Sequence, residues 1–307
     1  MKNVLQYYYG LIPASIHQKG KQYIFEIEKN NYVFLPTDRS LEELNTIFEI
    51  NNQLRERKIY THEIILNNNN SIVTFVNQIP YVLLKTFVKK DEIIILNDII
   101  YFQNNTILKQ NYPNINRTDW YHLWAHKIDY FEYQVSQLSK KYPLIQESFS
   151  YFLGLAENGI SLYKMLYQES KIEYTVSHKR VDSNSTLFDL YNPLNFIIDC
   201  KSRDASEYFK SLFLKKEDVI NDIIYYLKYS NLTDYEAQLF FIRMLFPTFY
   251  FDVYEEVITG EYKEKELQKV IIYAQKYEIL IKQIYQYLKS FIYLPEIEWI
   301  NNFNFHY

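Results

Sequence analysis

The sequence predicts an α+β protein of two lobes: a small β-rich N-lobe over residues 1–88 and a large, mainly helical C-lobe over residues 89–307. Three observations support this fold class. Short apolar runs bounded by polar turns fill the first part of the chain, as is typical of strands. The remainder carries apolar residues at helical spacing. A chain of 307 residues is also long enough for two lobes.

In the N-lobe, the first predicted feature is a hairpin. Residues 22–27 and 32–36 read as strands, and the polar residues 28–31 between them read as the turn. Ser40 then begins a helix, because Glu43 stands three residues later and completes a capping box. Three more strands are predicted after this helix, at residues 62–67, 71–76 and 81–88.

The C-lobe is predicted to begin with a short connector at Lys89 and Lys90, after which helical spacing dominates. Thr233 and Glu236 form a second capping box, which starts one of the later helices. The other predicted helices cover residues 91–102, 118–139, 144–167, 216–229 and a last long stretch at 263–291.

Composition narrows the class of protein. Charged residues make up 23% of the chain and the net charge is −4. The chain therefore has no overall positive charge that would favour binding of nucleic acid. The N-terminus lacks the apolar core of a signal peptide, and no run approaches the roughly 18 apolar residues of a membrane span. One cysteine, Cys200, permits no internal disulfide and no multi-cysteine zinc site. We therefore expect a soluble protein made in the cytoplasm.

Residues 177–208 are the most informative stretch. His178 precedes a polar loop, and the apolar run 194–198 then ends abruptly in Asp199. Arg203 and Asp204 follow shortly afterwards and open a helix-like segment. A carboxylate at the end of a buried strand is a common way to hold Mg²⁺ in phosphoryl-transfer sites. The five glycines, in contrast, form no glycine-rich phosphate loop.

Two further segments, SFSYFLGLAENGI at 148–160 and LFFIRMLFPTFYFD at 239–252, stand in order with IDCKSRDASEYFK at 198–210. Together they resemble the CotS/YutH-type spore coat proteins, closest to the YutH branch. The resemblance implies a bilobed protein-kinase-like fold, related to aminoglycoside phosphotransferases, with a degenerate catalytic loop at 177–204. It also implies synthesis in the mother-cell cytoplasm, a place in the spore coat and other coat proteins as partners.

The catalytic loop departs from the family pattern at its most important position. The catalytic Asp is expected two residues after His178, where this chain has Arg180. A guanidinium stays charged and cannot accept a proton. Asp182 lies nearby as a possible substitute base. The metal-binding Asn is expected at Ser185, and Asn184 stands one residue short of it.

The phosphate-pairing Lys is also missing. The resemblance places it at Leu35, whose apolar side chain cannot neutralise a phosphate. Its carboxylate partner would come from the following helix, where Glu42, Glu43 and Glu49 are the candidates. Without the Lys, we expect each of them to act as a capping or solvated residue.

Asp199 is the best-preserved chemical group. It could be one Mg²⁺ ligand, or it could brace its loop by accepting hydrogen bonds from backbone N–H groups; we favour the second. Asp204 matches the family residue that buttresses the catalytic loop. Arg203 and Glu207 are spaced for an ion pair at the start of a helix. Cys200 is expected to be a small buried apolar residue.

His122 and His126 stand four residues apart on a predicted helix, with Asp119 and Asp129 nearby. This places two imidazoles on one face. The motif lacks the Glu of H-E-x-x-H, so we predict no metal site from it and expect a surface or interlobe helix face.

These observations favour a catalytically inactive, kinase-like protein that acts as a structural or interaction component of the spore coat, without cofactor, nucleic acid or membrane span. The alternative is an active small-molecule phosphotransferase that binds Mg-ATP, with Asp199 holding Mg²⁺ and Asp182 acting as an unusual base. The sequence does not indicate an oligomeric state.

Overall fold

The fold is taken from a computed structural model, which describes residues 1–88 and 92–301. The predicted connector, Lys89 and Lys90, and the predicted helix start at Asp91 lie outside the described residues. The chain forms two compact units. Unit 1 comprises residues 1–95, 108–116 and 178–198, and unit 2 comprises 96–107, 117–177 and the residues from 199 onward.

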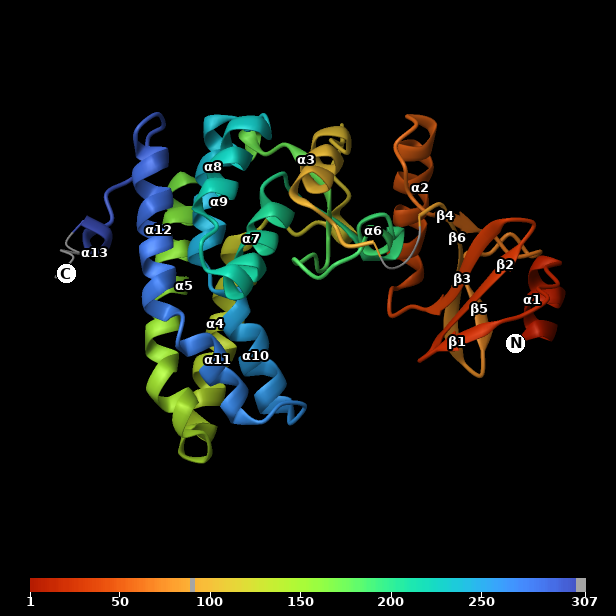
Figure 1. The fold of residues 1–307 in the computed structure, drawn as a ribbon, viewed down its shortest axis with the longest axis horizontal. Helices are drawn as coiled ribbons and strands as arrows, with labels where there is room; N and C mark the ends of the chain where they lie inside the picture. The colour runs from red at the N-terminus through yellow and green to blue at the C-terminus, as the bar shows by residue number, and fades with distance from the viewer. Residues whose placement is uncertain (89–91, 302–307) are drawn as a thin grey trace. The chain divides into compact units, whose positions relative to one another are not determined.

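Unit 1 is built on one antiparallel sheet with the strand order β1-β2-β3-β6-β4 (Figure 1). Strand β4 pairs with residues 83–85 of β6, and β5 pairs with residues 79–81 of the same strand. The strands are β1 His17–Lys19, β2 Gln22–Ile27, β3 Asn30–Pro36, β4 Glu63–Ile65, β5 Thr74–Val76 and β6 Ile79–Thr86.

The predicted hairpin is confirmed. Strands β2 and β3 pair in antiparallel register, with Tyr23 opposite Phe34 and Ile27 opposite Asn30. The two residues between the strands, Glu28 and Lys29, both have positive φ, at 49° and 67°. This is the geometry of a two-residue type I′ turn, whose twist matches that of the strands it joins.

Two helices flank the sheet. Helix α1, Lys2–Tyr9, was not predicted; it ends at Gly10, whose φ of 67° is a left-handed cap. It buries Leu5 against Phe25 and Phe34 of the sheet. Helix α2, Leu41–Glu56, begins at the predicted capping box of Ser40 and Glu43, which is confirmed.

The remaining parts of unit 1 come from later in the chain. They are the 3₁₀ turn η1 Pro113–Ile115, the one-turn helix α6 Leu187–Leu190 and the 3₁₀ turn η4 Pro193–Asn195. Helix α6 has its own capping box, in which the Thr186 side chain accepts from the Asp189 N–H and Asp189 accepts from the Thr186 N–H. This cap fixes the middle of the predicted catalytic loop, residues 177–204.

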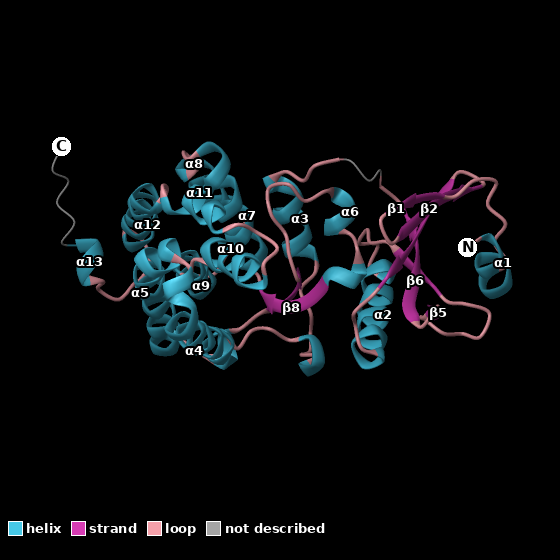
Figure 2. Ribbon diagram, turned by 90° about the horizontal axis from the view of Figure 1, so that it is seen from below, coloured by secondary structure: helices cyan, strands magenta, loops and turns pink. Residues whose placement is uncertain are grey.

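Unit 2 is mainly helical, and α4, α5, α9 and α12 lie together in it (Figures 1 and 2). Gly159 lets α5 approach α9 closely, because a Cβ there would stand 3.4 Å from the Ile242 carbonyl oxygen. The longer helices are α3 Leu96–Asn105, α4 Trp120–Leu138, α5 Pro143–Leu166, α7 Arg203–Lys216, α8 Ile220–Tyr229, α9 Asp234–Leu245, α10 Thr248–Thr259 and α12 Ala274–Lys289.

Short elements complete unit 2. They are the 3₁₀ turns η2 Ser139–Lys141, η3 Glu169–Lys171 and η5 Glu264–Leu267, and the short helices α11 Gln268–Ile271 and α13 Glu298–Asn301. The single long helix predicted at 263–291 is wrong, because η5, α11 and α12 follow one another there as separate elements. The helix predicted at 216–229 is present as α8, but it begins later, at Ile220, because Lys216 still belongs to α7.

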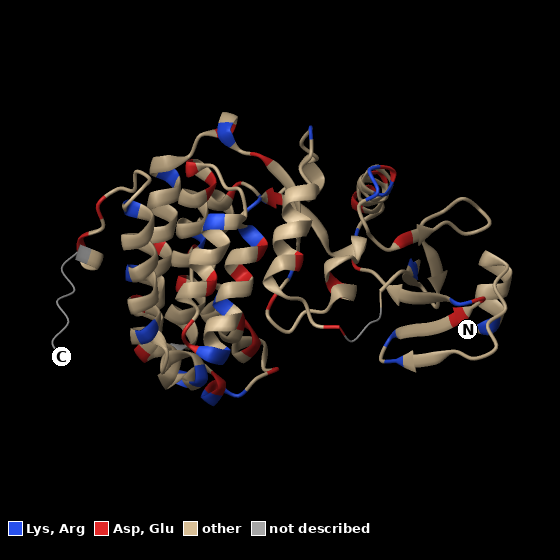
Figure 3. Ribbon diagram, turned by 45° about the horizontal axis from the view of Figure 1, so that its top comes forward, with Lys and Arg blue, Asp and Glu red and all other residues tan. Residues whose placement is uncertain are grey.

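Two short strands, β7 Tyr174–His178 and β8 Phe196–Cys200, pair with each other, and the boundary between the units passes through both. A small antiparallel sheet with a mainly helical remainder confirms the predicted α+β class. Lys and Arg are interspersed with Asp and Glu over the helices of unit 2, as Figure 3 shows.

Candidate functional site

Leu35, where the resemblance places the phosphate-pairing Lys, carries no charge. Leu35 lies at the end of β3, opposite Val82 of β6, and its side chain is buried. An apolar side chain offers no donor to a phosphate. The side chain at this position therefore packs as part of the sheet.

Glu43, on the helix after this strand, is paired with a residue that sequence reasoning missed. Arg39 donates to the Glu43 carboxylate at 3.1 Å and to the carbonyl oxygens of Leu194 and Phe196, at 3.1 and 2.5 Å. Burial raises the pKa of Glu43, but the Ser40 N–H and the Arg39 guanidinium outweigh it and lower the pKa. The i,i+4 spacing of Arg39 and Glu43 was the available signal.

The other two candidate carboxylates also have structural surroundings. Glu49 accepts from the Gln53 side-chain amide at 3.0 Å and from the Tyr112 hydroxyl at 3.1 Å. The Glu42 side chain is exposed.

A buried histidine stands near the start of the predicted catalytic loop, residues 177–204. The His178 Nε2 lies 2.7 Å from the Leu190 carbonyl oxygen, so the ring connects the first part of this segment to helix α6. Because a carbonyl oxygen only accepts, Nε2 carries the proton. Lys179 donates from its backbone to the Asn195 carbonyl oxygen and from its side chain to Asp38 at 3.1 Å. Arg180 is exposed.

Asp182 holds a turn in this loop. Its Oδ1 accepts from the Asn184 backbone N–H at 2.7 Å and from the Ser185 hydroxyl at 3.2 Å. Its backbone N–H in turn donates to the Ser185 hydroxyl oxygen. Asp182, Asn184 and Ser185, the three residues weighed as substitute base and metal ligand, are therefore partners of one another.

A cavity of about 490 Å³ in unit 1 brings the strand end and the loop together. Polar and apolar side chains line this cavity, and they include two carboxylates and two cationic groups. Its lining residues are Leu35, Pro36, Thr37, Asp38, Lys179, Arg180, Ser185, Asp189, Asn192, Leu194 and Asn195. One carboxylate, Asp189, is engaged in the cap of α6, and the other, Asp38, pairs with Lys179.

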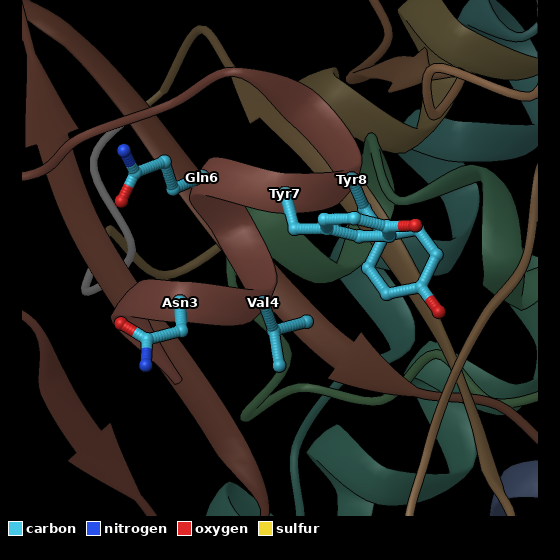
Figure 4. A pocket seen from close by; sticks show the side chains of 5 residues that line it. All are labelled: Asn3, Val4, Gln6, Tyr7 and Tyr8. Carbon is cyan, nitrogen blue, oxygen red and sulfur yellow. The ribbon is translucent and has the colours of Figure 1, made fainter.

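A second, shallower hollow of about 650 Å³ lies along α1 in the same unit (Figure 4). Its lining residues, Asn3, Val4, Gln6, Tyr7 and Tyr8, carry no charged group, and the rings of Tyr7 and Tyr8 meet edge to face at 4.9 Å.

In unit 2, the Asp199 carboxylate is fully buried and already satisfied. Its Oδ1 accepts from the Trp120 indole N–H at 2.9 Å and from the Cys200 backbone N–H at 2.7 Å. Its Oδ2 accepts from Arg203 at 2.7 Å, and the Asp199 side chain is 0% exposed. The guanidinium supplies the positive charge that a metal ion would bring to this carboxylate.

Arg203 also has a partner that the spacing argument did not select. It forms an ion pair with Asp199, four residues before it. Burial lowers the pKa of Arg203, but the charges of Asp199 and of Glu207, the predicted partner, outweigh burial and raise the pKa. Glu207 contacts Lys210 and Arg243, at 3.0 and 2.9 Å, and accepts from the Thr248 hydroxyl. The contact with Asp199 compensates a carboxylate that is buried at the end of a strand.

A buried charge cluster surrounds Glu207. Burial would raise the pKa of Glu207, but Lys210 and Arg243 lower it to about 2. Burial lowers the pKa of Lys210 to about 8 despite the field of Glu207. The Arg243 guanidinium lies 4.8 Å from the centre of the Trp120 ring, so this cluster and Asp199 share Trp120.

Asp204 and Cys200 occupy buried positions on either side of Arg203. Asp204 lies in the first turn of α7, where a carboxylate is favoured by the helix dipole. Burial, followed by the Asp199 charge, raises the pKa of the Cys200 thiol well above its usual value, which leaves an unreactive thiol. Trp120 and Arg243 were not predicted, since only tertiary packing brings them to this place.

Within residues 1–88 and 92–301, no group of three or more His, Cys, Asp or Glu side chains is arranged to hold a metal ion. In the same described residues, no helix is both long and apolar enough to cross a membrane.

Comparison with known proteins gives a family and a fold. The model of the family described as "Spore coat putative kinase YutH" matches residues 2–291. The endospore coat-associated protein YutH of Bacillus subtilis (strain 168) is 24% identical over 208 residues, or 59% of this chain. This chain spans 61% of the length of that relative.

Solved structures share the fold at low sequence identity. An aminoglycoside phosphotransferase from Alicyclobacillus acidocaldarius has a TM-score of 0.73 at 11% identity, over 94% of this chain and 96% of that one. A spectinomycin phosphotransferase bound to ADP and spectinomycin has a TM-score of 0.57 at 12% identity, over 92% and 96%. The predicted aminoglycoside-phosphotransferase-like fold is thereby confirmed.

Proposed function

The chain belongs to the spore coat YutH family of kinase-like proteins, and on this basis we propose that it is a structural or interaction component of the spore coat without phosphotransferase activity. The proposed location follows that of its coat-associated relative. In this proposal the protein is made in the mother-cell cytoplasm and other coat proteins are its partners.

The observation that carries the inactive assignment is the state of Asp199. Three donors occupy its carboxylate, and one of them is the Arg203 cation. A Mg²⁺ ion takes oxygen ligands and bridges to phosphates, so it would have to displace Arg203 from a fully buried partner. A buried carboxylate that loses its ion pair is costly by about 3–5 kcal/mol.

Two more positions support the same conclusion. Leu35 is packed in the sheet and Arg180 stands where a catalytic Asp is expected, so phosphate pairing and proton abstraction both lack a group. The alternative, phosphotransfer with Asp182 as base, gains no support, because Asp182 is engaged in its own turn with Asn184 and Ser185.

The activity part is tested with purified protein, Mg-ATP and a panel of small amino and hydroxyl acceptors. We expect no phosphorylated product from the parent or from Asp199→Ala. Product formation that Asp199→Ala abolishes would refute the proposal.

The location part is tested separately by a fluorescent fusion followed through sporulation. A ring of signal around the developing spore is expected. A diffuse signal throughout sporulation would count against the coat assignment and would leave the question of catalysis unchanged.

A further inference from the structure

We propose that His122 and His126 form half of a zinc site, which a second copy of this chain completes. The feature that carries this inference is the exposed face of α4, the helix that Figure 2 shows at the margin of the helices of unit 2. It goes beyond the proposed coat function, which requires no metal and no dimer.

One of the two imidazoles is already oriented as a metal ligand. His122 lies 2.7 Å from Asp119 through its Nδ1, and both side chains are well exposed. Since a carboxylate only accepts, Nδ1 carries the proton, which leaves Nε2 as the nitrogen through which the neutral imidazole can bind a metal. A carboxylate that holds the second nitrogen of a histidine fixes the ring and raises its basicity, as is usual around zinc.

The second imidazole lies one helical turn further on. The His126 side chain is exposed, and its ring centre is 6.4 Å from that of His122. Residues four apart share one face of a helix. Turning an exposed ring between staggered rotamers can bring both Nε2 atoms to the roughly 2.0–2.1 Å from one ion that zinc requires.

Two imidazoles fill only half of the shell, because structural zinc is almost always four-coordinate and tetrahedral. Among the described residues of one chain, no third His, Cys, Asp or Glu completes the group. A two-fold axis through the ion would add the same two histidines from a second copy. Most homodimers use such an isologous contact.

An independent feature of α4 points to the same partner. Three large side chains stand out from this face, with exposed fractions of 44% for Leu123, 57% for Tyr130 and 66% for Tyr133. Their spacing of seven and three residues continues the stripe of His122 and His126 along one side of the helix. A second α4 held there by zinc would cover these side chains, which a monomer leaves in water.

The test is sedimentation velocity of the full chain, without a histidine tag, in ZnCl₂ and in EDTA at neutral pH. We expect a dimer with zinc, a monomer with EDTA, and one ion per two chains by metal analysis. His126→Ala should remain monomeric in zinc. His17→Ala, which removes an exposed histidine from β1 in unit 1, is the matched control and should dimerise like the parent.

The exposed stripe adds a further readout, because Tyr133→Ala should weaken the zinc dimer. Three results would each overturn the proposal. They are the same sedimenting mass in ZnCl₂ as in EDTA, one zinc ion bound per monomer, and dimerisation of His126→Ala to the same extent as the parent.

Discussion

Removal of the Arg203 side chain should show how much the buried ion pair between Arg203 and Asp199 contributes to the stability of the protein. In Arg203→Ala, the fully buried Asp199 carboxylate keeps its bonds to Trp120 and Cys200 but loses its ion pair. Breaking a buried pair costs about 3–5 kcal/mol, and the two remaining donors favour the lower end, about 3 kcal/mol. Asp199→Asn should cost less, about 1.5 kcal/mol, because the Arg203 side chain is 16% exposed and keeps some access to water.

A double-mutant cycle isolates the pair. If the two residues are coupled by about 2 kcal/mol, the double variant should cost about 2.5 kcal/mol, less than the sum of about 4.5 kcal/mol for the two single variants. The free energies come from urea unfolding followed by far-UV circular dichroism, with Lys215→Ala as a control for the loss of a cation from the same helix. A cost below about 1 kcal/mol for Arg203→Ala, or purely additive variants, would refute the role of Arg203 as a replacement cation.

Three other changes have defined outcomes. The pKa of Glu207 is lowered to about 2, so its stabilising contribution, on the order of 3 kcal/mol, is present above about pH 4.5 and is lost as pH falls through 2. The stability gap between the parent and Glu207→Gln should therefore close over that acid range in urea titrations; a constant gap would contradict the pKa. Lys29→Gly should raise the free energy of unfolding by about 0.5–1 kcal/mol, because Lys29 has a φ of 67°, whereas Lys19→Gly in β1 should lower it. Arg39→Met should lower it by about 2–3 kcal/mol, since two carbonyl oxygens and Glu43 lose their donor; an unchanged urea midpoint would show that this contact is dispensable.

The parts of the fold that the sequence predicted correctly are those fixed by neighbouring residues. The hairpin at β2 and β3 and the capping boxes at Ser40 and Thr233 depend on side chains within a few positions of one another. The apolar spacing at 263–291 is equally regular, yet the chain breaks into η5, α11 and α12, because packing overrides a pattern that only permits a helix.

At the candidate site, too, the sequence pattern did not identify the contacts that tertiary packing creates. Arg203 has an acidic residue four positions away on each side, and spacing alone does not show that the fully buried Asp199 at a strand end is a direct ion-pair partner. Glu207 also acts on Arg203 through its charge, and it has Lys210 and Arg243 beside it. Helix α1 could have been found from Gly10, a typical left-handed cap after an apolar run.

The absence of a working nucleotide site is tested by the melting temperature of the purified protein in millimolar ATP, with and without Mg²⁺. ATP at 100 times the dissociation constant of a nucleotide site would stabilise the fold by about 2.7 kcal/mol, which corresponds to several degrees for a chain of this size. We expect an unchanged melting temperature under both conditions. A rise of several degrees that needs Mg²⁺ and disappears in Asp199→Ala would contradict the assignment of an inactive protein.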